Sequence, residues 1–518
     1  MRPFEAKTST RRTRGTATPS EELRIAVTFR RPHDGLGPTK LDARLSARSV
    51  ESVRPDPLDM DRALFEMHRR GFETSIRGKL TASIRGTRRQ FEKLFGTKLE
   101  RFTTDRNQAS QFQAFYYPPK GAPWNPDPGV TSMIDDAYIQ WPHLYMARRR
   151  PRRAKPPARS SARGKKNRSR VVKPSPISPQ VPYFHLDVPQ GVVRMLNVGP
   201  VHEAGFTGKG VRIVMVDSGF AHDHPFFVLH KYQSSIALAP GAANRDADAN
   251  GHGTGESANI FAVAPDATFI GVKVDNDDDP RAGASMLEGF QEALRHSPKV
   301  ISISMGYDLR ADDGVAPLTE LPKSLVALEA EIQAAVAAGI IVVFSSGNGH
   351  YSFPGQMKEV ISAGGVFADA AGRLSASDYA SAFQSRIYSG RSVPDFCGLV
   401  GMLPHADYIA LPVPPGSEID ADNAEHDATT GDDGWGVFSG TSAAAPQLAG
   451  VCALLLQKNP SLTAGDIKAA LKSTARDVST GHANPSSDPR RRGTSARRGL
   501  DGATGAGLVD AFAAWRQV

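Results

Sequence analysis

The chain has 518 residues, a hydrophobic content of 40% and a formal net charge of +9, and it contains two cysteines. This length allows two to four domains with sizeable apolar cores. Cys397 and Cys452 allow at most one disulfide, which excludes a disulfide-stapled scaffold and favours two reduced thiols. No apolar run follows Met1 and no stretch is long and apolar enough to span a membrane. We therefore expect no signal peptide, no membrane span and a cytoplasmic location.

The positive charge is concentrated in one segment. Thirteen lysines and arginines, and no acid, lie between Arg148 and Lys173, so the rest of the chain is mildly acidic. The segment is rich in Pro, Ser and Ala and poor in large apolar residues, which is typical of disorder. Such a segment attracts nucleic acid or anionic lipid without specificity. A solvated linker over residues 148–180 is the simpler interpretation, and we do not expect nucleic acid as a partner.

Before this linker, residues 23–147 predict a small α+β domain, preceded by a disordered N-terminus over residues 1–22. Alternating apolar residues indicate strands, and Thr87-Arg88-Arg89-Gln90 is a capping box that opens a helix. The expected elements in chain order are a strand at 22–29, a helix at 58–71, a strand pair or one long strand at 72–84, the helix after Thr87, and strands at 98–103 and 114–117. The order β-α-β-(β)-α-β favours a ferredoxin-like domain.

From residue 181 to residue 518 the chain alternates apolar strands with helices, which favours a parallel sheet with helices on both faces. Strands are expected at 211–216, 268–274, 300–304, 340–345 and 360–366, and helices at 286–295, 321–338, 445–458 and 464–473. Active sites in such open sheets lie at the carboxyl ends of the strands. Asp217, Ser304 and Asn348 each follow or end a predicted strand, so we expect them to share a cleft.

A candidate nucleophile precedes one of the C-terminal helices. Ser442 lies at or just before the helix start, where backbone donors and the helix dipole favour developing negative charge. A serine nucleophile needs a base to take its proton. Asp217 ends a strand, His252 lies in a glycine-rich loop, and Asn348 follows another strand. The chain order Asp, His, Ser is one of the orders in which catalytic triads occur.

Five motifs in this order resemble those of the subtilase (subtilisin-like) serine peptidases. They are VDSG at 216–219, HGT at 252–254, SMG at 304–306, SGN at 346–348 and GTSAAAP at 440–446. The resemblance covers residues 181–518 and implies a subtilisin-like α/β catalytic domain. It also implies a serine endopeptidase that hydrolyses protein or peptide substrates through an acyl-enzyme intermediate.

The resemblance assigns a role to each candidate residue. Ser442 would attack the scissile carbonyl, and His252 would take the proton and return it to the leaving amine. Asp217 would orient the imidazole and stabilise its cation. Asn348 would donate a hydrogen bond from its side-chain amide to the oxyanion, as one of the donors of the oxyanion hole.

The segment Ser304, Met305 and Gly306 resembles the family's edge segment, which pairs with an extended substrate backbone. The N-terminal domain is similar to propeptides of subtilases and, more closely, of sedolisins, on the phrase IRGTRRQFEKLFGT at 84–97. This similarity implies a zymogen whose own N-terminal domain is an intramolecular inhibitor, with the tail at 135–146 in the substrate cleft. We expect activation by cleavage between about Leu144 and Lys173, by the enzyme itself or by another protease. A permanently attached domain is the alternative.

Each candidate residue also has a purely structural interpretation: a turn for Asp217, a loop for His252, a left-handed turn residue for Asn348 and an N-cap for Ser442. In this combination and order, a catalytic site is the simpler explanation. The alternative function is a catalytically inert subtilase scaffold that binds a protein partner or nucleic acid. All four residues that the chemistry needs are present, which argues against this alternative.

The chain departs from the family pattern after the histidine. Gly255 and Glu256 stand where the family commonly has another histidine and a small apolar residue. The absent histidine does no chemistry, so we expect altered packing and not lost activity. His252 itself disfavours the sedolisin mechanism, which uses a carboxyl base.

Two acidic segments carry oxygen ligands that suit calcium, DNDDD at 275–279 and DADN at 420–423. Neither has the spacing of a known calcium loop, so solvated acidic turns are the simpler interpretation. We expect no required cofactor and no metal site, with calcium as the one metal to test.

Overall fold

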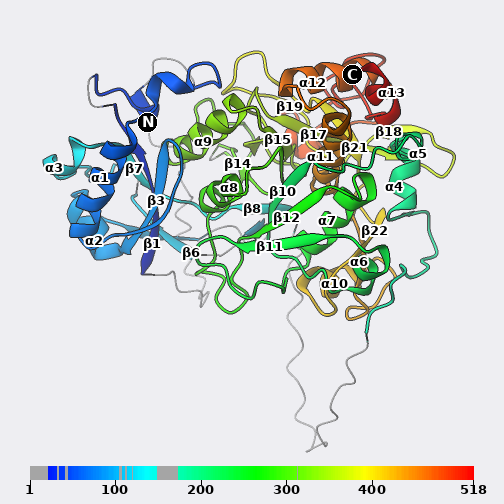
Figure 1. Ribbon diagram of the computed structural model, residues 1–518, viewed down its shortest axis with the longest axis horizontal. Coiled ribbons are helices and arrows are strands. Elements are labelled where there is room, and N and C mark those ends of the chain that lie inside the picture. Colours follow the sequence, from blue (N-terminus) through cyan, green and yellow to red (C-terminus); the bar gives the residue numbers. More distant parts are fainter. Residues whose placement is uncertain are drawn as a thin grey trace, which may run out of the picture.

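The computed structural model describes residues 21–31, 34–40, 45–103, 108–110, 114–119, 121–148, 173–311 and 313–518. The predicted disordered N-terminus before residue 21 and the basic linker at 149–172 lie outside these residues. The described chain forms a small N-terminal domain, which packs on a larger α/β domain (Figure 1).

The N-terminal domain is built on a four-stranded antiparallel sheet with the strand order β2-β3-β1-β7. Its strands are β1 (Glu22–Phe29), β2 (Glu73–Arg77), β3 (Thr81–Thr87) and β7 (Ile134–Ile139), and its two main helices are α1 (Pro57–Arg69) and α2 (Arg88–Leu94). The capping box at the start of α2 is present, with Thr87 and Gln90 as its two members. The order β-α-β-β-α-β with this strand arrangement is that of ferredoxin-like domains.

The fourth strand of this sheet is not one that the sequence predicted. The predicted strands at 98–103 and 114–117 form a separate pair, β4 (Glu100–Thr103) with β6 (Ala114–Tyr117). The edge position in the sheet belongs to β7, whose last five residues, 135–139, we expected to lie in the cleft as part of the tail. Ile134, Ala137 and Ile139 are buried in the domain core, so this segment is a core strand. The part of the tail that leaves the domain therefore begins after Ile139.

The larger domain is built on an eight-stranded sheet, in which the main path runs β11-β12-β10-β13-β15-β17-β18 and β21 pairs with β17. All pairs are parallel except β17 with β18. The strands are β10 (Arg212–Asp217), β11 (Ser234–Leu238), β12 (Thr268–Lys273), β13 (Val300–Ile303), β15 (Ile341–Ser345), β17 (Ile361–Ala368), β18 (Leu374–Ala376) and β21 (Phe396–Leu399). The mostly parallel sheet confirms the predicted fold class.

Helices cover both faces of this sheet (Figure 1). Successive residues of a strand point to opposite faces, so each strand contributes to two cores. Ile213 and Met215 of β10 pack in the core with α7 (His252–Val263) and α11 (Thr441–Lys458). Val214 and Val216 pack in the core with α8 (Met286–Arg295) and α9 (Val326–Ala337). Both faces are therefore buried, as the continuous apolar strands predict.

The remaining described elements are shorter or peripheral. They are β5 (Gln108–Ser110), α3 (Pro128–Thr131), β8 (Leu144–Arg148), β9 (Leu186–Asp187), α4 (Gln190–Met195), α5 (Gly199–Glu203), α6 (Pro225–His230), β14 (Tyr307–Asp308), β16 (Ser352–Phe353), β19 (Phe383–Gln384), β20 (Ser392–Val393), β22 (Ile409–Pro412), α10 (Glu418–Asn423), β23 (Trp435–Phe438), α12 (Ala464–Thr474) and α13 (Ala511–Gln517). Single 3₁₀ turns lie at Pro38–Lys40, Val50–Val53, Lys323–Leu325 and Pro485–Ser487.

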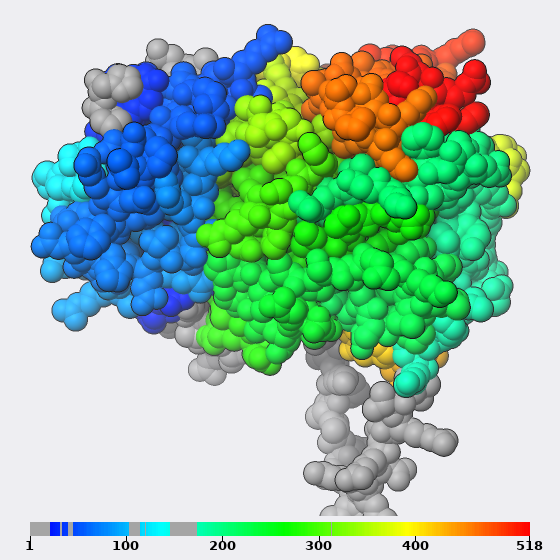
Figure 2. Space-filling view, in the orientation of Figure 1, coloured from blue at the N-terminus to red at the C-terminus, as the bar shows by residue number. Residues whose placement is uncertain are grey.

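The N-terminal domain lies against α8 and α9, as Figure 2 shows at the boundary between its blue and green surfaces. Glu331 of α9 is fully buried there. Its carboxylate accepts hydrogen bonds from the main-chain N–H groups of Lys79, Leu80 and Thr81, at 3.2, 2.9 and 2.8 Å. A carboxylate from the larger domain thus satisfies three donors of the turn between β2 and β3.

Candidate active site

Asp217 and His252 are in direct contact. Asp217 is the last residue of β10, and His252 is the first residue of α7. The Nδ1 atom of His252 lies 2.7 Å from Oδ1 of Asp217, and both side chains are buried. Because an ionised carboxylate only accepts hydrogen bonds, Nδ1–H is the donor. The Nε2 atom is then left to exchange a proton with another group.

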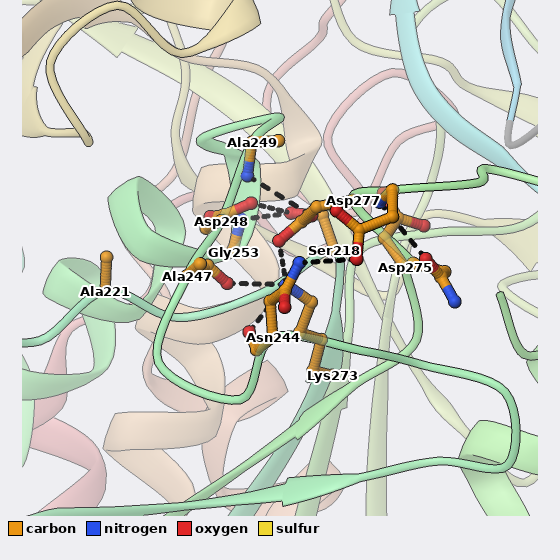
Figure 3. Close-up of polar contacts among 12 residues, drawn as sticks. Ser218, Ala221, Asn244, Ala247, Asp248, Ala249, Gly253, Lys273, Asp275 and Asp277 are labelled. Atoms are coloured by element: carbon orange, nitrogen blue, oxygen red, sulfur yellow. Dashed lines mark hydrogen bonds and ion pairs between the residues drawn. The ribbon is translucent and has the colours of Figure 1, made fainter.

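His252 lies in a helix, and not in the loop that its glycine-rich surroundings predict. Asp248 explains the difference, because its carboxylate accepts from the N–H groups of Gly251 and Thr254, each at 2.9 Å, and from the Thr254 hydroxyl at 2.7 Å. These are the donors that a helix start leaves unsatisfied. Asp248 also accepts from the hydroxyl of Ser218 at 2.9 Å (Figure 3). Asp248 therefore joins the end of β10 to the start of α7, and the sequence did not single it out.

Gly253 allows this close approach. A Cβ atom at this position would lie 2.3 Å from the carbonyl oxygen of Gly219 and 2.9 Å from Cβ of Asp217. The Gly253 N–H donates to the Ser218 hydroxyl at 3.0 Å. The glycine after the histidine is thus required by the packing of α7 on the turn that follows Asp217.

The environment of His252 raises its pKa. Burial alone would lower it, but the charge and hydrogen bond of Asp217, with the charges of Glu256 and Asp248, outweigh burial and raise the pKa of His252 to about 9. The imidazolium form is therefore stabilised where a base must hold a proton during a reaction. Glu256 is itself buried one helical turn after His252, and burial raises its pKa to about 8.

Ser442 is the second residue of α11 and lies beside the end of β13. Its hydroxyl is 3.5 Å from the carbonyl oxygen of Ser304, and the Ser304 hydroxyl donates to the carbonyl oxygen of Ser442 at 2.8 Å. Helices α7 and α11 pack against each other. Both begin at the edge where the parallel strands end, so Ser442 and His252 lie at the same edge of the sheet.

Asn348 is held against the start of α11. Its Oδ1 atom accepts from the N–H of Thr441 at 2.9 Å and from the Thr441 hydroxyl at 3.0 Å. A Cβ atom on Gly440 would lie 2.6 Å from the Asn348 amide nitrogen. The amide group of Asn348 is thus fixed beside the residues that precede Ser442. The structure therefore brings all four predicted chemical residues to one edge of the sheet.

The segment that follows the N-terminal domain lies in this site. Leu144 forms an antiparallel bridge with Gly306, with N–H to carbonyl distances of 2.8 and 3.0 Å. The next residue, Tyr145, is buried, and its ring centre lies 5.6 Å from that of His252. The segment predicted to bind an extended backbone is therefore paired, at Gly306, with the chain's own Leu144.

A buried polar network that the sequence did not predict lies beneath the site. Glu256 accepts from the side-chain amide of Asn259 at 3.0 Å, and Asn259 accepts from Gln447 at 3.1 Å. All three side chains are buried. Since Gln447 belongs to α11, the network joins the helix of His252 to the helix of Ser442. The only sequence signal was the departure from the family pattern at Gly255 and Glu256.

Two acids of the segment at 275–279 are paired with cationic side chains. The buried ammonium group of Lys273 donates to the carbonyl oxygens of Asn244 and Ala247, at 3.1 and 2.7 Å, and to Asp277 at 2.6 Å (Figure 3). Asp279 is paired with Arg281. At 420–423, the Asp420 carboxylate accepts from a main-chain N–H of its own loop. Among the described residues no three or more His, Cys, Asp or Glu side chains are arranged to hold a metal ion.

Among the residues placed by the structure, no helix combines the length and apolar character needed to cross a bilayer.

Comparison with known proteins supports the same assignment. The sequence profile described as the subtilase family matches residues 208–507. Subtilisin E of Bacillus subtilis (strain 168) is 25% identical over 299 residues, which are 56% of this chain and 66% of subtilisin E. Subtilisin of Bacillus pumilus is 25% identical over 299 residues, and the match covers 91% of its length. This chain therefore spans just under two thirds of the length of subtilisin E.

A solved structure has a similar fold over most of the chain. The crystal structure of fervidolysin from Fervidobacterium pennivorans, described as a keratinolytic enzyme related to subtilisin, matches with a TM-score of 0.51 and 18% identity. The match covers 96% of this chain and 61% of fervidolysin. Family profile, homologues and fold agree, and the chain belongs to the subtilase family of serine peptidases.

Proposed function

We propose that this protein is a serine endopeptidase made as a zymogen, and that its N-terminal domain is its inhibitor. Ser442 is the nucleophile, His252 is the general base and then the general acid, and Asp217 orients His252 through Nδ1. The observation that carries the proposal is the 2.7 Å contact between Asp217 and His252, which lies on a helix that packs against the helix of Ser442.

Catalysis follows from these positions. The Ser442 hydroxyl makes a long contact of 3.5 Å with the Ser304 carbonyl, which rotation about its Cα–Cβ bond exchanges for one with His252. His252 takes the hydroxyl proton as the oxygen attacks, and Asp217 stabilises the resulting cation. Asn348 and the N–H of Ser442, at the start of α11, stabilise the oxyanion. His252 then returns the proton to the leaving amine, and water hydrolyses the acyl-enzyme by the reverse steps.

The strand pairing supports a proposal for the bond that the enzyme would cut in its own chain. In an antiparallel pair, the residue two positions after Leu144 faces the residue two positions before Gly306. If the register of the Leu144–Gly306 bridge continues, Met146 faces Ser304, which contacts Ser442. The carbonyl group of Met146 is then the one presented to the nucleophile, and we assign the Met146–Ala147 bond as the activation site.

The test compares the wild-type protein with Ser442→Ala. We expect wild-type protein to yield a new N-terminus at Ala147, read by N-terminal sequencing and intact mass, while Ser442→Ala remains full length. Identical cutting of both proteins would disprove self-processing. If both remain full length under conditions where peptides are cleaved, activation by processing is wrong.

A fluorophosphonate probe tests the catalytic residues directly. The probe should label Ser442 in wild-type protein, and His252→Ala should slow labelling by about 10²–10⁴-fold, the usual contribution of a general base. His296→Ala, a partly exposed histidine at the C-terminal end of α8, is the matched control and should label like wild type. Absence of labelling in wild-type protein would contradict the proposed function.

A further inference from the structure

Tyr145 is the tail side chain that lies beside the catalytic pair. Its ring packs against His252, and its hydroxyl donates to the Oδ1 atom of Asp275. Only 4% of Tyr145 is exposed. The ring therefore occupies a space that has an imidazole on one side and a carboxylate at the far end.

The position of Asp275 is fixed by the main chain around the catalytic aspartate. The N–H of Val274 donates to the carbonyl oxygen of Asp217 at 2.9 Å, and the N–H of Asp275 donates to that of Ser218 at 3.2 Å. The acids that follow are engaged elsewhere, Asp277 with Lys273 and Asp279 with Arg281. The carboxylate of Asp275 is thus held at a set distance from His252 and faces the tail.

We infer that Asp275 is a specificity-determining residue, and that the enzyme selects substrates with tyrosine immediately before the residue whose carbonyl group is attacked. This inference rests on the proposed function and on the strand pairing that places Met146 at the attacked position. A substrate bound like the tail would place its penultimate side chain where Tyr145 lies. A phenylalanine there would fill the space but leave the carboxylate without a donor.

The physical reason is that a buried polar group left without a partner costs more free energy than its hydrogen bond contributes. A site built to bind a hydroxyl group rejects the analogue that lacks it, because the polar group of the site loses its partner. The carboxylate is already in an unfavourable place, since burial raises the pKa of Asp275 to about 7 and the hydrogen bond from Tyr145 opposes that rise. The nearby acids Asp248, Asp217 and Asp277 raise the pKa further. A hydrogen-bond donor in the substrate offsets the repulsion among these like charges.

The experiment uses processed enzyme and four peptides based on residues 140–150, QWPHLYMARRR, with Tyr, Phe, Leu or Lys at the position of Tyr145. In wild-type enzyme we expect kcat/KM for the Tyr peptide to exceed that for the Phe peptide by about tenfold or more, the usual effect of a hydrogen bond to a charged group. Asp275→Ala should abolish this ratio, and Asp275→Asn, which keeps an acceptor, should restore part of it. Asp278→Ala removes an exposed acid of the same loop and should keep the wild-type ratio.

The outcomes are distinct. Equal rates for the Tyr and Phe peptides in wild-type enzyme would overturn the inference while leaving the proposed function intact. A preference for Lys over Tyr would also overturn it, because it would show selection by charge. If Asp275→Ala does not fold, the wild-type comparison and Asp275→Asn still decide the matter. If no peptide is cleaved and the fluorophosphonate probe labels nothing, the proposed function fails and this inference fails with it.

Discussion

Glu256 shows how one buried residue changes the chemistry of its neighbour. It lies one helical turn after His252, and its charge is among the causes that raise the pKa of His252. Burial raises the pKa of Glu256 itself, while the charge of His252 lowers it. The two groups therefore stabilise each other's charged forms.

Glu256→Gln should shift the acid limb of the pH profile. A general base acts in its neutral form, so activity appears as the pH rises through the pKa of His252. Removing the carboxyl group removes a charge that raises this pKa, so the limb of kcat/KM should move to lower pH, by up to about one unit. The measurement is kcat/KM against pH for processed enzyme, with the exposed Glu320→Gln as the control. An unmoved limb would show that Glu256 is uncharged throughout this range.

The sequence pointed to the residues proposed to do the chemistry but not to those that hold them in place. Asp217, His252, Ser442 and Asn348 were identified from their motifs and order, which need no knowledge of contacts. Asp248 was not, because its function depends on the end of β10 and the start of α7, which meet at its carboxylate.

At the scale of elements, Lys273 supplies a positive charge within the acidic loop after β12. Its ammonium group is fully buried and is bound by two carbonyl oxygens and Asp277. These are the ligand types that bind calcium in other proteins. The ammonium group of a lysine side chain therefore stabilises the loop between β12 and α8.

We expect the melting temperature to be the same with calcium and with chelator, because Lys273 supplies the charge at this loop. Lys273→Met should lower the free energy of unfolding by about 3–5 kcal/mol, the usual effect of leaving one member of a buried ion pair unpaired. Urea unfolding in a Ser442→Ala background, which prevents self-cleavage, measures this change. Lys299→Met, at an exposed lysine, is the control. A rise of several degrees on adding calcium would contradict the expectation.

Apolar strands were the elements that the sequence predicted best. The strand at 211–216 corresponds to β10, and the strand at 268–274 to β12, each within one residue. Helix starts were harder to predict, since α11 begins at Thr441 and Pro446 lies inside it. We expected this helix to begin at residue 445, because proline is usual in a first turn. The start at Thr441 depends on its contact with Asn348, which lies 93 residues away.

At the scale of the whole molecule, the two domains meet through groups that are far apart in sequence. Glu331 accepts from Leu80 and Thr81, which lie about 250 residues before it. No local pattern in the sequence connects these segments, so the contact could not be predicted. Docking of the N-terminal domain also sets the position of the tail. The tail follows strand β7, and β7 is paired with β1 of the same domain.

Glu331 is therefore the residue through which the docking of the N-terminal domain can be tested. Glu331→Gln keeps one oxygen acceptor but removes the charge and presents an amide to the N–H of Lys79. A hydrogen bond to a charged group contributes about 1.5–3 kcal/mol, so the amides of residues 79–81 should exchange with deuterium about 10–100-fold faster. Hydrogen exchange on the uncut Ser442→Ala protein measures this effect, with Glu320→Gln as the control. The hairpin itself also protects this turn, because the N–H of Gly78 donates to the carbonyl oxygen of Thr81 at 2.9 Å. If exchange at 79–81 stays unchanged, the hairpin alone holds the turn and Glu331 does not anchor the domain.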